Sequence, residues 1–369
     1  MRHNQDLEVA IDARSFRTGL GTYTFNLLAG LAKTTRNLDV RAIVSNRTAK
    51  LFAPFCKSLR FVNAPIYTLR EQIQIPIAAR GCDVLHVPHY NLPLMHRGPL
   101  LATIHDLTHL LDENYARSAR SWFYARPMFG FVAHRAEHIF TVSEYSKARI
   151  VEKLGVDPAR ITVVHCGVSP QFRPLRCDTS QVEISGTVRI PRPYLLFVGN
   201  LKPHKNLATL LQAFRNLVNL GQEHSLICVG DDRRGRSATN ALIRQLNLTG
   251  RVWILAHVET DALVKLYAGA EVLVLPSFEE GFGLPVIEAM ACGTPVVCSR
   301  SASLPEVGGD AAEYFDPHSY DDLTTVLQHV LGSAQLREEM SRKGLLQSAK
   351  FTWENFVDRH YQVYKAFSC

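Results

Sequence analysis

The sequence lacks the features that mark several large classes of protein. It has no run of 18 apolar residues and no cleavable leader before the strand-like segment at residues 9–11, so we expect neither a transmembrane helix nor a signal peptide. Its eight cysteines form no C-x-x-C pair, and most lie in apolar patterns. This usage predicts reduced thiols in a cytosolic protein rather than a disulfide framework or a zinc site. No nucleic-acid recognition module occurs, and we expect no nucleic-acid partner.

Positive charge is concentrated in the first half of the chain. The formal net charge is +7, and residues 1–175 contain 22 Lys or Arg against 13 Asp or Glu, whereas residues 176–369 contain 19 against 21. Two interpretations stay open. The first half contacts an anionic surface, such as the headgroups at the inner face of a membrane or a pyrophosphate-linked acceptor, or its arginines are scattered and solvated.

The apolar pattern predicts strands that alternate with helices, which indicates parallel sheets covered by helices on both faces. Strands are expected at residues 7–11, 40–44, 61–62, 84–87, 100–104, 139–142, 161–165, 194–198, 225–229, 252–255, 272–275 and 295–298. Helices are expected at residues 19–31, 144–154, 207–220, 238–246, 261–268, 284–291, 320–331, 336–348 and 354–367. Residues 173–193 lack periodicity and contain three prolines, so a domain boundary is expected there.

The segment at residues 277–291, S-F-E-E-G-F-G-L-P-V-I-E-A-M-A, combines a glycine turn with a helix start. It follows an apolar strand pattern, and Pro285 suits the first turn of a helix. Free N–H groups at such a helix start bind anions. Glu280 on the turn and Glu288 about one helical turn inside add two carboxylates. The combination predicts a site for a ligand that carries both phosphate and hydroxyl groups, such as a nucleotide sugar.

A second anion site is expected in the loop at residues 199–206, G-N-L-K-P-H-K-N. A lysine just before a helix N-terminus adds its charge to the positive end of the helix dipole, so Lys202 and Lys205 are candidates for binding a diphosphate. Lysines in loops are normally solvated. The presence of another anion site in the same half favours a functional role for Lys205.

The first half offers two further candidates and one ambiguous segment. Gly19 and Gly21 do not complete a dinucleotide fingerprint, because position 24 is threonine and the loop is too long, which argues against a nicotinamide oxidoreductase. They are interpreted as positions where phosphate or sugar approaches the backbone, with ordinary turn glycines as the alternative.

His105 follows a strand end, where parallel sheets bind ligands. Residues 117–135 alternate basic and aromatic side chains, and a core-packed helix is favoured over a membrane-binding face.

Together these segments resemble retaining glycosyltransferases of the GT-B fold, glycosyltransferase family 4, in the form of its bacterial mannosyltransferase-like members. Residues 280–288, E-G-F-G-L-P-V-I-E, match that family's E-x7-E motif; residues 203–206, 103–107 and 19–24 resemble its lysine loop, histidine segment and glycine loop. The resemblance covers nearly the whole chain. It implies an α/β, GT-B architecture of two Rossmann-like domains facing across a cleft. The acceptor domain is expected at residues 1–175, the donor domain at 190–350, and a C-terminal helix at 351–369 that crosses back to the first domain.

The resemblance implies catalytic roles for His105, Lys205 and Glu280. Lys205 would neutralise the leaving diphosphate, Glu280 would hold hydroxyls of the donor sugar, and His105 would contact the transferred sugar. The remaining donor-binding positions that it implies are Gly19, Gly21, Asn200, Lys202, Gly230, His257, Val258, Gly281, Phe282, Gly283, Leu284 and Glu288. Glu288 would accept from the ribose hydroxyls. Asn200 stands where many members have an arginine, and Lys202 is its candidate substitute.

No metal or other cofactor is expected, because the chain contains no D-x-D pair to hold a divalent ion on the diphosphate. Retention of configuration at the anomeric carbon is compatible with a covalent carboxylate intermediate. The family instead favours attack by the acceptor on the face of the sugar that the diphosphate leaves, with the leaving phosphate oxygen taking the acceptor's proton. The expected donor is GDP-mannose, with a UDP-sugar next, and the expected acceptor is a glycan or a lipid-linked glycan in polysaccharide biosynthesis. A nucleotide-sugar epimerase of the same architecture and a non-catalytic sugar-nucleotide-binding protein are the alternatives.

Overall fold

The structure, a computed structural model, divides the chain into two compact units. It describes residues 7–15, 19–34, 37–66, 68–111, 119–175, 181–184, 188–231 and 233–367. Unit 1 takes the described residues up to Gly167 together with those from Thr352 onward, and unit 2 takes those from Val168 to Phe351. The last helix therefore belongs to the same unit as the first half of the sequence.

Unit 1 is built on a parallel sheet with the strand order β3-β2-β1-β4-β5-β6-β7. The strands are β1 (Leu7–Asp12), β2 (Leu38–Val44), β3 (Ser58–Phe61), β4 (Val84–Val87), β5 (Leu100–Thr103), β6 (His138–Thr141) and β7 (Ile161–Val163). Strands β2 and β3 are added on one side of β1, and strands β5 to β7 are added on the opposite side, beyond β4. The carboxyl ends of β1 and β4 therefore form a topological switch point, which is where such sheets bind ligands.

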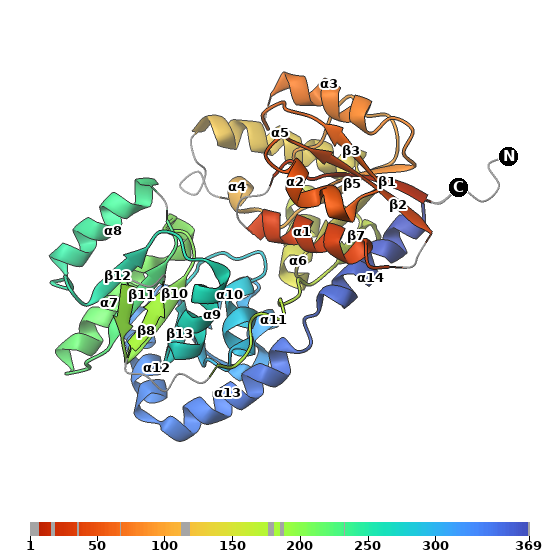
Figure 1. Cartoon of the computed structure of the whole chain (residues 1–369). Helices are drawn as coiled ribbons and strands as arrows, with labels where there is room; N and C mark the ends of the chain where they lie inside the picture. The colour runs from red at the N-terminus through yellow and green to blue at the C-terminus, as the bar shows by residue number, and fades with distance from the viewer. Residues whose placement is uncertain are drawn as a thin grey trace. The chain divides into compact units, whose positions relative to one another are not determined.

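Helices cover both faces of the sheet of unit 1 (Figure 1). They are α1 (Gly19–Leu31), α2 (Ala49–Phe52), α3 (Leu69–Ala78), α4 (Thr108–Leu111), α5 (Ala119–Arg135), α6 (Glu144–Leu154) and α14 (Trp353–Lys365), with 3-10 turns η1 (Ala53–Phe55) and η2 (Pro158–Arg160). One apolar core joins the sheet to α3, α5 and α6. The described side chains of α5 fit the core-packed interpretation, because Ala125, Phe129 and Val132 are fully buried while Arg126 is exposed. Arg117 lies outside the described residues.

The other face of this sheet carries α1 and α14, which lie side by side (Figure 1). A buried hydrogen-bond chain fixes α14 there: the Tyr23 hydroxyl lies 2.6 Å from His360 Nε2 and 3.0 Å from Thr103 Oγ1, while His86 bonds Thr103 and Tyr364 at 2.8 and 2.6 Å. Burial lowers the pKa of His360 to about 3 and lowers the pKa of His86 as well. Both imidazoles are therefore neutral, so each has one nitrogen that donates and one that accepts.

Unit 2 is built on a second parallel sheet with the strand order β12-β11-β10-β13-β14-β15. These strands are β10 (Tyr194–Val198), β11 (Ser225–Val229), β12 (Val252–Leu255), β13 (Val272–Leu275), β14 (Val296–Ser299) and β15 (Ala312–Phe315). An antiparallel ribbon of β8 (Gln181–Ile184) and β9 (Val188–Pro191) precedes them. The switch point here lies between β10 and β13.

Helices lie on both sides of this sheet (Figure 1). They are α7 (Leu207–Asn219), α8 (Arg233–Gln245), α9 (Thr260–Gly269), α10 (Leu284–Ala291), α11 (Leu304–Gly308), α12 (Tyr320–Gly332) and α13 (Ala334–Ser348), with 3-10 turns η3 (Pro203–Lys205) and η4 (Gly309–Ala311). Within the described residues, β10, β11, β13 and β14 are almost entirely buried. Continuous apolar strands are expected for a sheet covered on both faces.

The predicted α/β class is confirmed, and several elements match their expected bounds, including β4, β10 to β13, α6 and α10. Three expectations were wrong in detail. β3 lies at Ser58–Phe61 rather than at residues 61–62, because it is an edge strand with a weak apolar pattern. Helix α8 begins at Arg233, five residues before the expected 238. Residues 173–193, where a domain boundary was expected, contain the β8–β9 ribbon, in which Val182 and Ile190 are buried, and the division between the two units falls earlier, after Gly167.

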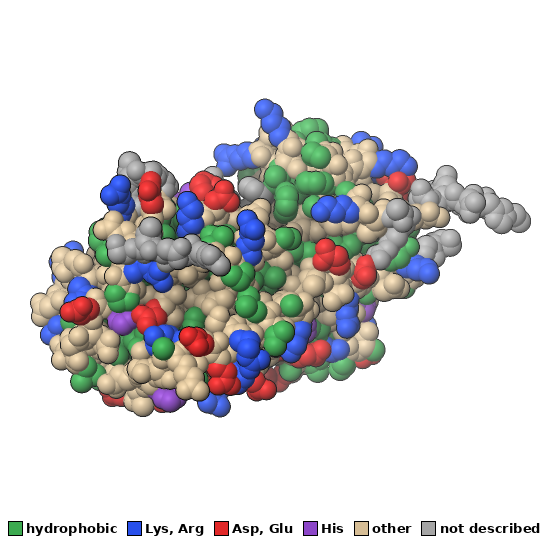
Figure 2. Space-filling view, turned by 60° about the horizontal axis from the view of Figure 1, so that its bottom comes forward, with side chains coloured by type: hydrophobic (Ala, Val, Ile, Leu, Met, Phe, Trp, Pro, Cys, Tyr) green, Lys and Arg blue, Asp and Glu red, His purple; other side chains and the backbone are tan. Residues whose placement is uncertain are grey.

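The expectations of no membrane-spanning helix and of reduced cysteines can be compared with the described residues. Among the described residues, no helix is both long and apolar enough to cross a membrane, and none of the six described cysteines forms a disulfide. On the face that Figure 2 shows, blue Lys and Arg side chains are mixed with red Asp and Glu side chains rather than gathered in one large basic field.

Candidate active site

The loops that follow β10 and β13 meet at the switch point of unit 2. The Lys205 ammonium and the Glu280 Oε1 atom form an ion pair, and their side chains are only 13% and 10% exposed. Ser277 Oγ donates to the same carboxylate oxygen at 2.9 Å. The backbone N–H of Phe278 donates to His204 O at 2.8 Å and ties the two loops together. Two residues that the sequence proposed from separate motifs are thus in contact.

Asn206 fixes the loop that carries Lys205. Its backbone is left-handed, with φ of 54°, a conformation that asparagine tolerates better than most residues. Its buried side-chain amide donates to Pro276 O at 3.0 Å and to Pro317 O at 2.8 Å. These bonds hold the start of α7 against the end of β13, so the position of Lys205 is set by the sheet rather than by a mobile loop.

Three serines at alternating positions, beginning with the last residue of β14, hold the loop that carries Glu280. Ser299 donates to Ser277 O, and Ser301 Oγ donates to Phe278 O at 2.6 Å. Ser303 Oγ lies 3.0 Å from Glu280 O and 2.8 Å from Phe282 O. The sequence interpretation missed these positioning residues. The spacing S-x-S-x-S at the end of a buried strand was the available signal.

Helix α10 begins at this loop. Gly283 has φ of 106°, so the backbone conformation favours glycine, and a Cβ atom there would also have to displace the end of the Leu304 side chain, 2.9 Å away. Leu284 is the first helical residue, and the first N–H groups of a helix have no partner inside it. The Phe282 side chain is buried against Phe351, with ring centroids 5.6 Å apart, so this ring belongs to the packing below the loop. The arrangement can bind an anion at the side of the Lys205–Glu280 pair.

Glu288 lies inside α10, and its carboxyl group faces the neighbouring helix α9. Tyr267 OH donates to Glu288 Oε2 at 2.8 Å. Burial raises the pKa of Glu288 to about 7, and the hydrogen bond from Tyr267 acts in the opposite direction. The carboxyl group is therefore poised between its neutral and ionised forms near neutral pH. No sequence signal pointed to Tyr267, because it precedes its partner by 21 residues on another helix.

The other candidates in unit 2 lie along the same carboxyl edge of the sheet. Gly230, after β11, has φ of 139°, and a Cβ atom there would lie 2.0 Å from Gly199 O, so packing alone accounts for this glycine. Asn200 Oδ1 accepts from the N–H of Lys202 at 3.2 Å, so the Asn200 side chain bonds its own loop. His257, after β12, is 82% exposed and lies 3.1 Å from Glu259, and Val258 follows it. Gly281 precedes Phe282 in the Glu280 loop.

His105 lies at the carboxyl end of β5 in unit 1. Its Nε2 atom is 3.2 Å from Pro88 O, and because a carbonyl only accepts, Nε2 carries the proton. Burial lowers the pKa of His105, so the ring is neutral and Nδ1 is an acceptor. The ring packs edge-on against Tyr23, with centroids 4.7 Å apart. Gly19 and Gly21 are part of the first turn of α1, as expected, and a Cβ atom at Gly19 would meet nothing within 4 Å.

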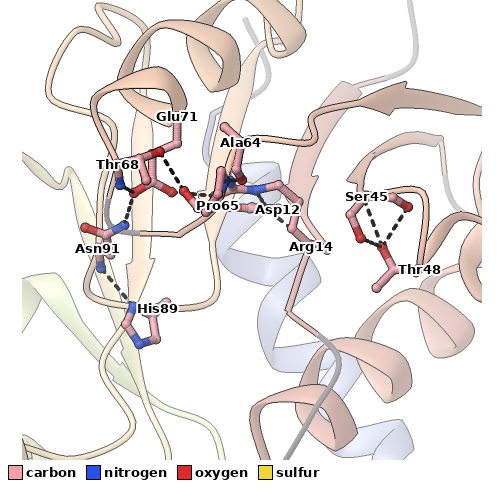
Figure 3. Close-up of polar contacts among 10 residues, drawn as sticks. All are labelled: Asp12, Arg14, Ser45, Thr48, Ala64, Pro65, Thr68, Glu71, His89 and Asn91. Atoms are coloured by element: carbon pink, nitrogen blue, oxygen red, sulfur yellow. Dashed lines mark hydrogen bonds and ion pairs between the residues drawn. The ribbon is translucent and has the colours of Figure 1, made fainter. Parts of the chain in front are cut away.

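The switch point of unit 1 holds a second cluster of charged residues (Figure 3). Arg14 Nη2 lies 2.8 Å from Asp12 Oδ2 and 2.9 Å from Glu71 Oε2, and Asn91 Nδ2 donates to Glu71 Oε1 at 2.7 Å. His89 Nδ1 accepts from the N–H of Asn91 at 3.1 Å. Burial acts to lower the pKa of Arg14, but Asp12 and Glu71 outweigh it and raise the pKa. The formal charges of Asp12, Arg14 and Glu71 sum to −1. Asp12 and Arg14 line a small pocket together with His89 and Asn91, and these polar side chains suit hydroxyl groups.

Comparison with known proteins agrees with this architecture. Residues 17–172 match the family described as Glycosyltransferase Family 4, and residues 183–347 match the family described as Glycosyl transferases group 1. An O-antigen chain mannosyltransferase B of Escherichia coli is 31% identical over 285 residues, which cover 76% of this chain and 74% of that protein. A sucrose-phosphate synthase from Thermosynechococcus elongatus has a TM-score of 0.78 at 19% identity, covering 98% of each chain. Anabaena Alr3699/HepE, solved in complex with UDP-glucose, has a TM-score of 0.78 at 16% identity and covers 98% of this chain and 100% of its own.

Two parallel α/β units, together with the likeness to these two solved structures, define the GT-B fold. The chain belongs to glycosyltransferase family 4 and is a hexosyltransferase. The fold class and the family that the sequence motifs predicted are thereby confirmed. The roles of the individual residues stay predictions.

Proposed function

We propose that the chain transfers mannose from GDP-mannose to a glycan or lipid-linked acceptor in the synthesis of a surface polysaccharide. A UDP-sugar is the second donor candidate. The observation that carries the proposal is the contact between Lys205 and Glu280 beside the start of α10. The name of the E. coli relative supports mannose, and the UDP-glucose in the HepE complex supports the second candidate. We place the reaction in the cytoplasm.

The donor binds with its diphosphate between the Lys205 ammonium and the first N–H groups of α10. Glu280, held by Lys205 and Ser277, accepts from hydroxyls of the sugar. During transfer the bond from the anomeric carbon to the phosphate oxygen breaks and a bond to the acceptor oxygen forms on the same face. The acceptor's proton passes to the departing phosphate oxygen. Lys205 and the helix dipole stabilise the negative charge that grows on the diphosphate, so the reaction uses no metal.

Unit 1 binds the acceptor in this proposal. His105 presents a bare Nδ1 atom, which accepts a hydrogen bond from a sugar hydroxyl. The Asp12–Arg14–Glu71 cluster carries more negative than positive charge, so it repels a phosphate and favours an uncharged sugar. The acceptor's reacting end is therefore a neutral sugar, even where the acceptor carries a lipid diphosphate further away.

Donor affinity should depend on pH through Glu288. The ribose hydroxyls bind the ionised carboxylate best, and a folded-state pKa of about 7 means that the ionised fraction falls as the pH drops through 7. We expect the Kd of GDP-mannose, measured by calorimetry, to rise several-fold between pH 8 and pH 6. The diphosphate of a nucleotide sugar has no group that titrates in this range.

Two variants separate this effect from other titrations. Glu288→Gln should bind more weakly at pH 8 and show a flat profile. Tyr267→Phe removes the hydrogen bond that lowers the pKa of Glu288, so the midpoint of the profile should move to higher pH. A parent profile that is flat from pH 6 to pH 8 would count against a ribose-binding role for Glu288.

The function is tested first by donor selection. A panel of nucleotide sugars is screened by thermal shift, and GDP-mannose should give the largest increase, since a ligand at about 100 times its Kd stabilises the folded state by about 2.7 kcal/mol. The transfer assay then uses labelled GDP-mannose with a neutral mannoside and with its phosphorylated analogue, with and without EDTA. We expect a product with retained configuration from the neutral acceptor only, at the same rate in EDTA.

The other outcomes are equally informative. A larger shift with a UDP-sugar would replace the donor assignment. An epimerised sugar formed without acceptor would identify an epimerase, and binding without transfer or hydrolysis would identify a binding protein. Loss of activity in EDTA would contradict metal independence.

A further inference from the structure

Exposed apolar side chains are concentrated in one part of unit 1. Among the described residues, 7 of the 12 large hydrophobic side chains with substantial exposure lie between residues 61 and 95. We call them the α3 surface, and they are Phe61, Ile66, Leu69, Ile73, Ile77, Leu94 and Met95. Single exposed apolar residues are ordinary, but a group of this size marks an interaction site.

Helix α3 provides the centre of the α3 surface. Leu69, Ile73 and Ile77 recur every four residues along its outer side and are 86%, 52% and 59% exposed. The opposite side of α3 is anchored, because Glu71 is fully buried and bonds Arg14 (Figure 3) and Ile75 is fully buried in the core. The orientation of α3 is therefore fixed by its inner side. The outer apolar stripe has no internal role that would account for it.

Two neighbouring segments extend the stripe. The N–H of Leu94 donates to Gln72 Oε1 at 2.6 Å, which attaches the loop after β4 to α3 and so places Leu94 and Met95, 48% and 63% exposed, next to this helix. On the other side of α3, Phe61 of the edge strand β3 is 59% exposed and lines a shallow groove with Arg70 and Ile77. Strand, helix and loop thus contribute to one surface.

The exposed charges in this region are positive. Arg60, Arg70, Arg80 and Arg97 are all exposed. Between residues 57 and 97 the chain has only two carboxylates: Glu71 is buried in its ion pair with Arg14, and Asp83 accepts from the N–H of Glu8 at 2.8 Å. The remaining cation in this stretch, Lys57, pairs with Asp39. Apolar side chains interspersed with arginines match the interface of an anionic bilayer, where the apolar groups enter and the guanidinium groups meet phosphates.

We propose that the α3 surface docks the enzyme on an anionic phospholipid membrane, as a peripheral contact. The proposal replaces residues 117–135 as the candidate membrane segment, since the described inner side chains of α5 are core residues. The docking itself does not depend on the proposed function. Only its purpose, which is to bring the active site to a lipid-linked acceptor, rests on that function. A flat bilayer suits the α3 surface better than an acidic protein partner, because the apolar groups protrude from a convex helix and a loop rather than line a deep cavity.

The test is sedimentation of the purified full-length chain with vesicles. Vesicles with about 30 mol % phosphatidylglycerol in phosphatidylcholine should bind the chain, and binding should fall in about 0.5 M salt and on pure phosphatidylcholine. Ile73→Asp and Met95→Asp should each lower the bound fraction at least tenfold, because they place a carboxylate among the apolar groups. Arg70→Glu should remove the preference for the anionic lipid.

Matched controls exist in unit 2. Leu220 and Leu346 are 59% and 63% exposed, and Leu220→Asp and Leu346→Asp should bind vesicles like the parent. Thermal unfolding and the shift with GDP-mannose should be unchanged in Ile73→Asp, so a failure of docking and a failure of the proposed function are distinguishable. The proposal is overturned if the parent does not bind anionic vesicles, if the α3 and control variants behave alike, or if the α3 surface instead joins two copies of the chain in solution.

Discussion

Replacing Lys205 with alanine should lower kcat/KM for sugar transfer by about 10²–10³-fold, the range found when one stabilising group is removed from a preorganised site. The ammonium is the positive charge that our proposal places beside the diphosphate. It also balances Glu280, whose side chain is only 10% exposed. In the variant the leaving diphosphate loses its cation and meets an unbalanced carboxylate. Both kcat and donor affinity should therefore fall.

The comparison variants are Lys205→Arg and Lys265→Ala. Arginine keeps the charge but has a planar group of different shape, so it should recover part of the activity. Lys265 is an exposed lysine on α9 and controls for the loss of a surface charge in the same unit. Circular dichroism and unfolding should show that each variant is folded. Transfer by Lys205→Ala at the parent rate would end the assignment of the diphosphate site.

Much of the fold was predictable because the strands of a sheet covered on both faces are nearly continuous apolar runs. Strands β10, β11 and β13 were placed at their observed bounds for this reason, as was the start of α10 from its glycine and proline. Elements at the edge of a sheet or outside it were not placed correctly. β3 has no buried residue and β8 exposes alternate side chains, so their hydrophobic signal is diluted.

Helix α3 was missed although its sequence carries a helix-start signal. Thr68 and Glu71 form a capping box, the T-x-x-E spacing that precedes many helices. The apolar residues that would have indicated a helix point both inward, as Ile75 does, and outward, as Leu69 and Ile73 do. A helix with two apolar sides has little amphipathic contrast, and we propose that the outward side serves the membrane contact rather than the core.

The candidate active site was likewise predictable only in part. Lys205 and Glu280 could be proposed because each lies in a loop with its own anion-binding pattern, and because the sequence resembles a known family. Their direct contact, the serines at 299, 301 and 303, and the bond from Tyr267 to Glu288 depend on which loops the sheet order brings together. Strand order between β10 and β13 is a tertiary property that no local pattern specifies.

Replacing Glu280 with glutamine should lower kcat by about 10²–10³-fold while the KM for the donor stays within a few-fold of the parent value. Glutamine keeps the size of the side chain and one carbonyl acceptor for Ser277. It removes the negative charge that stabilises positive charge growing on the sugar ring during transfer. The same carboxylate repels the diphosphate in the ground state. Relief of this repulsion offsets the weaker hydrogen bonds to the sugar hydroxyls, so donor binding changes little. Glu279→Gln, the same change one residue earlier, should keep most of the activity.

The split between kcat and KM distinguishes this role from a structural one, because a collapsed loop would weaken donor binding as well. A double variant adds a sharper comparison. Lys205 and Glu280 are in contact, so if they act as a unit, Lys205→Ala with Glu280→Gln should cost little more than the worse single change. If the fold-reduction of the double variant equals the product of the two single fold-reductions, the two side chains act on the donor independently. The ion pair would then be only a resting contact that the donor displaces.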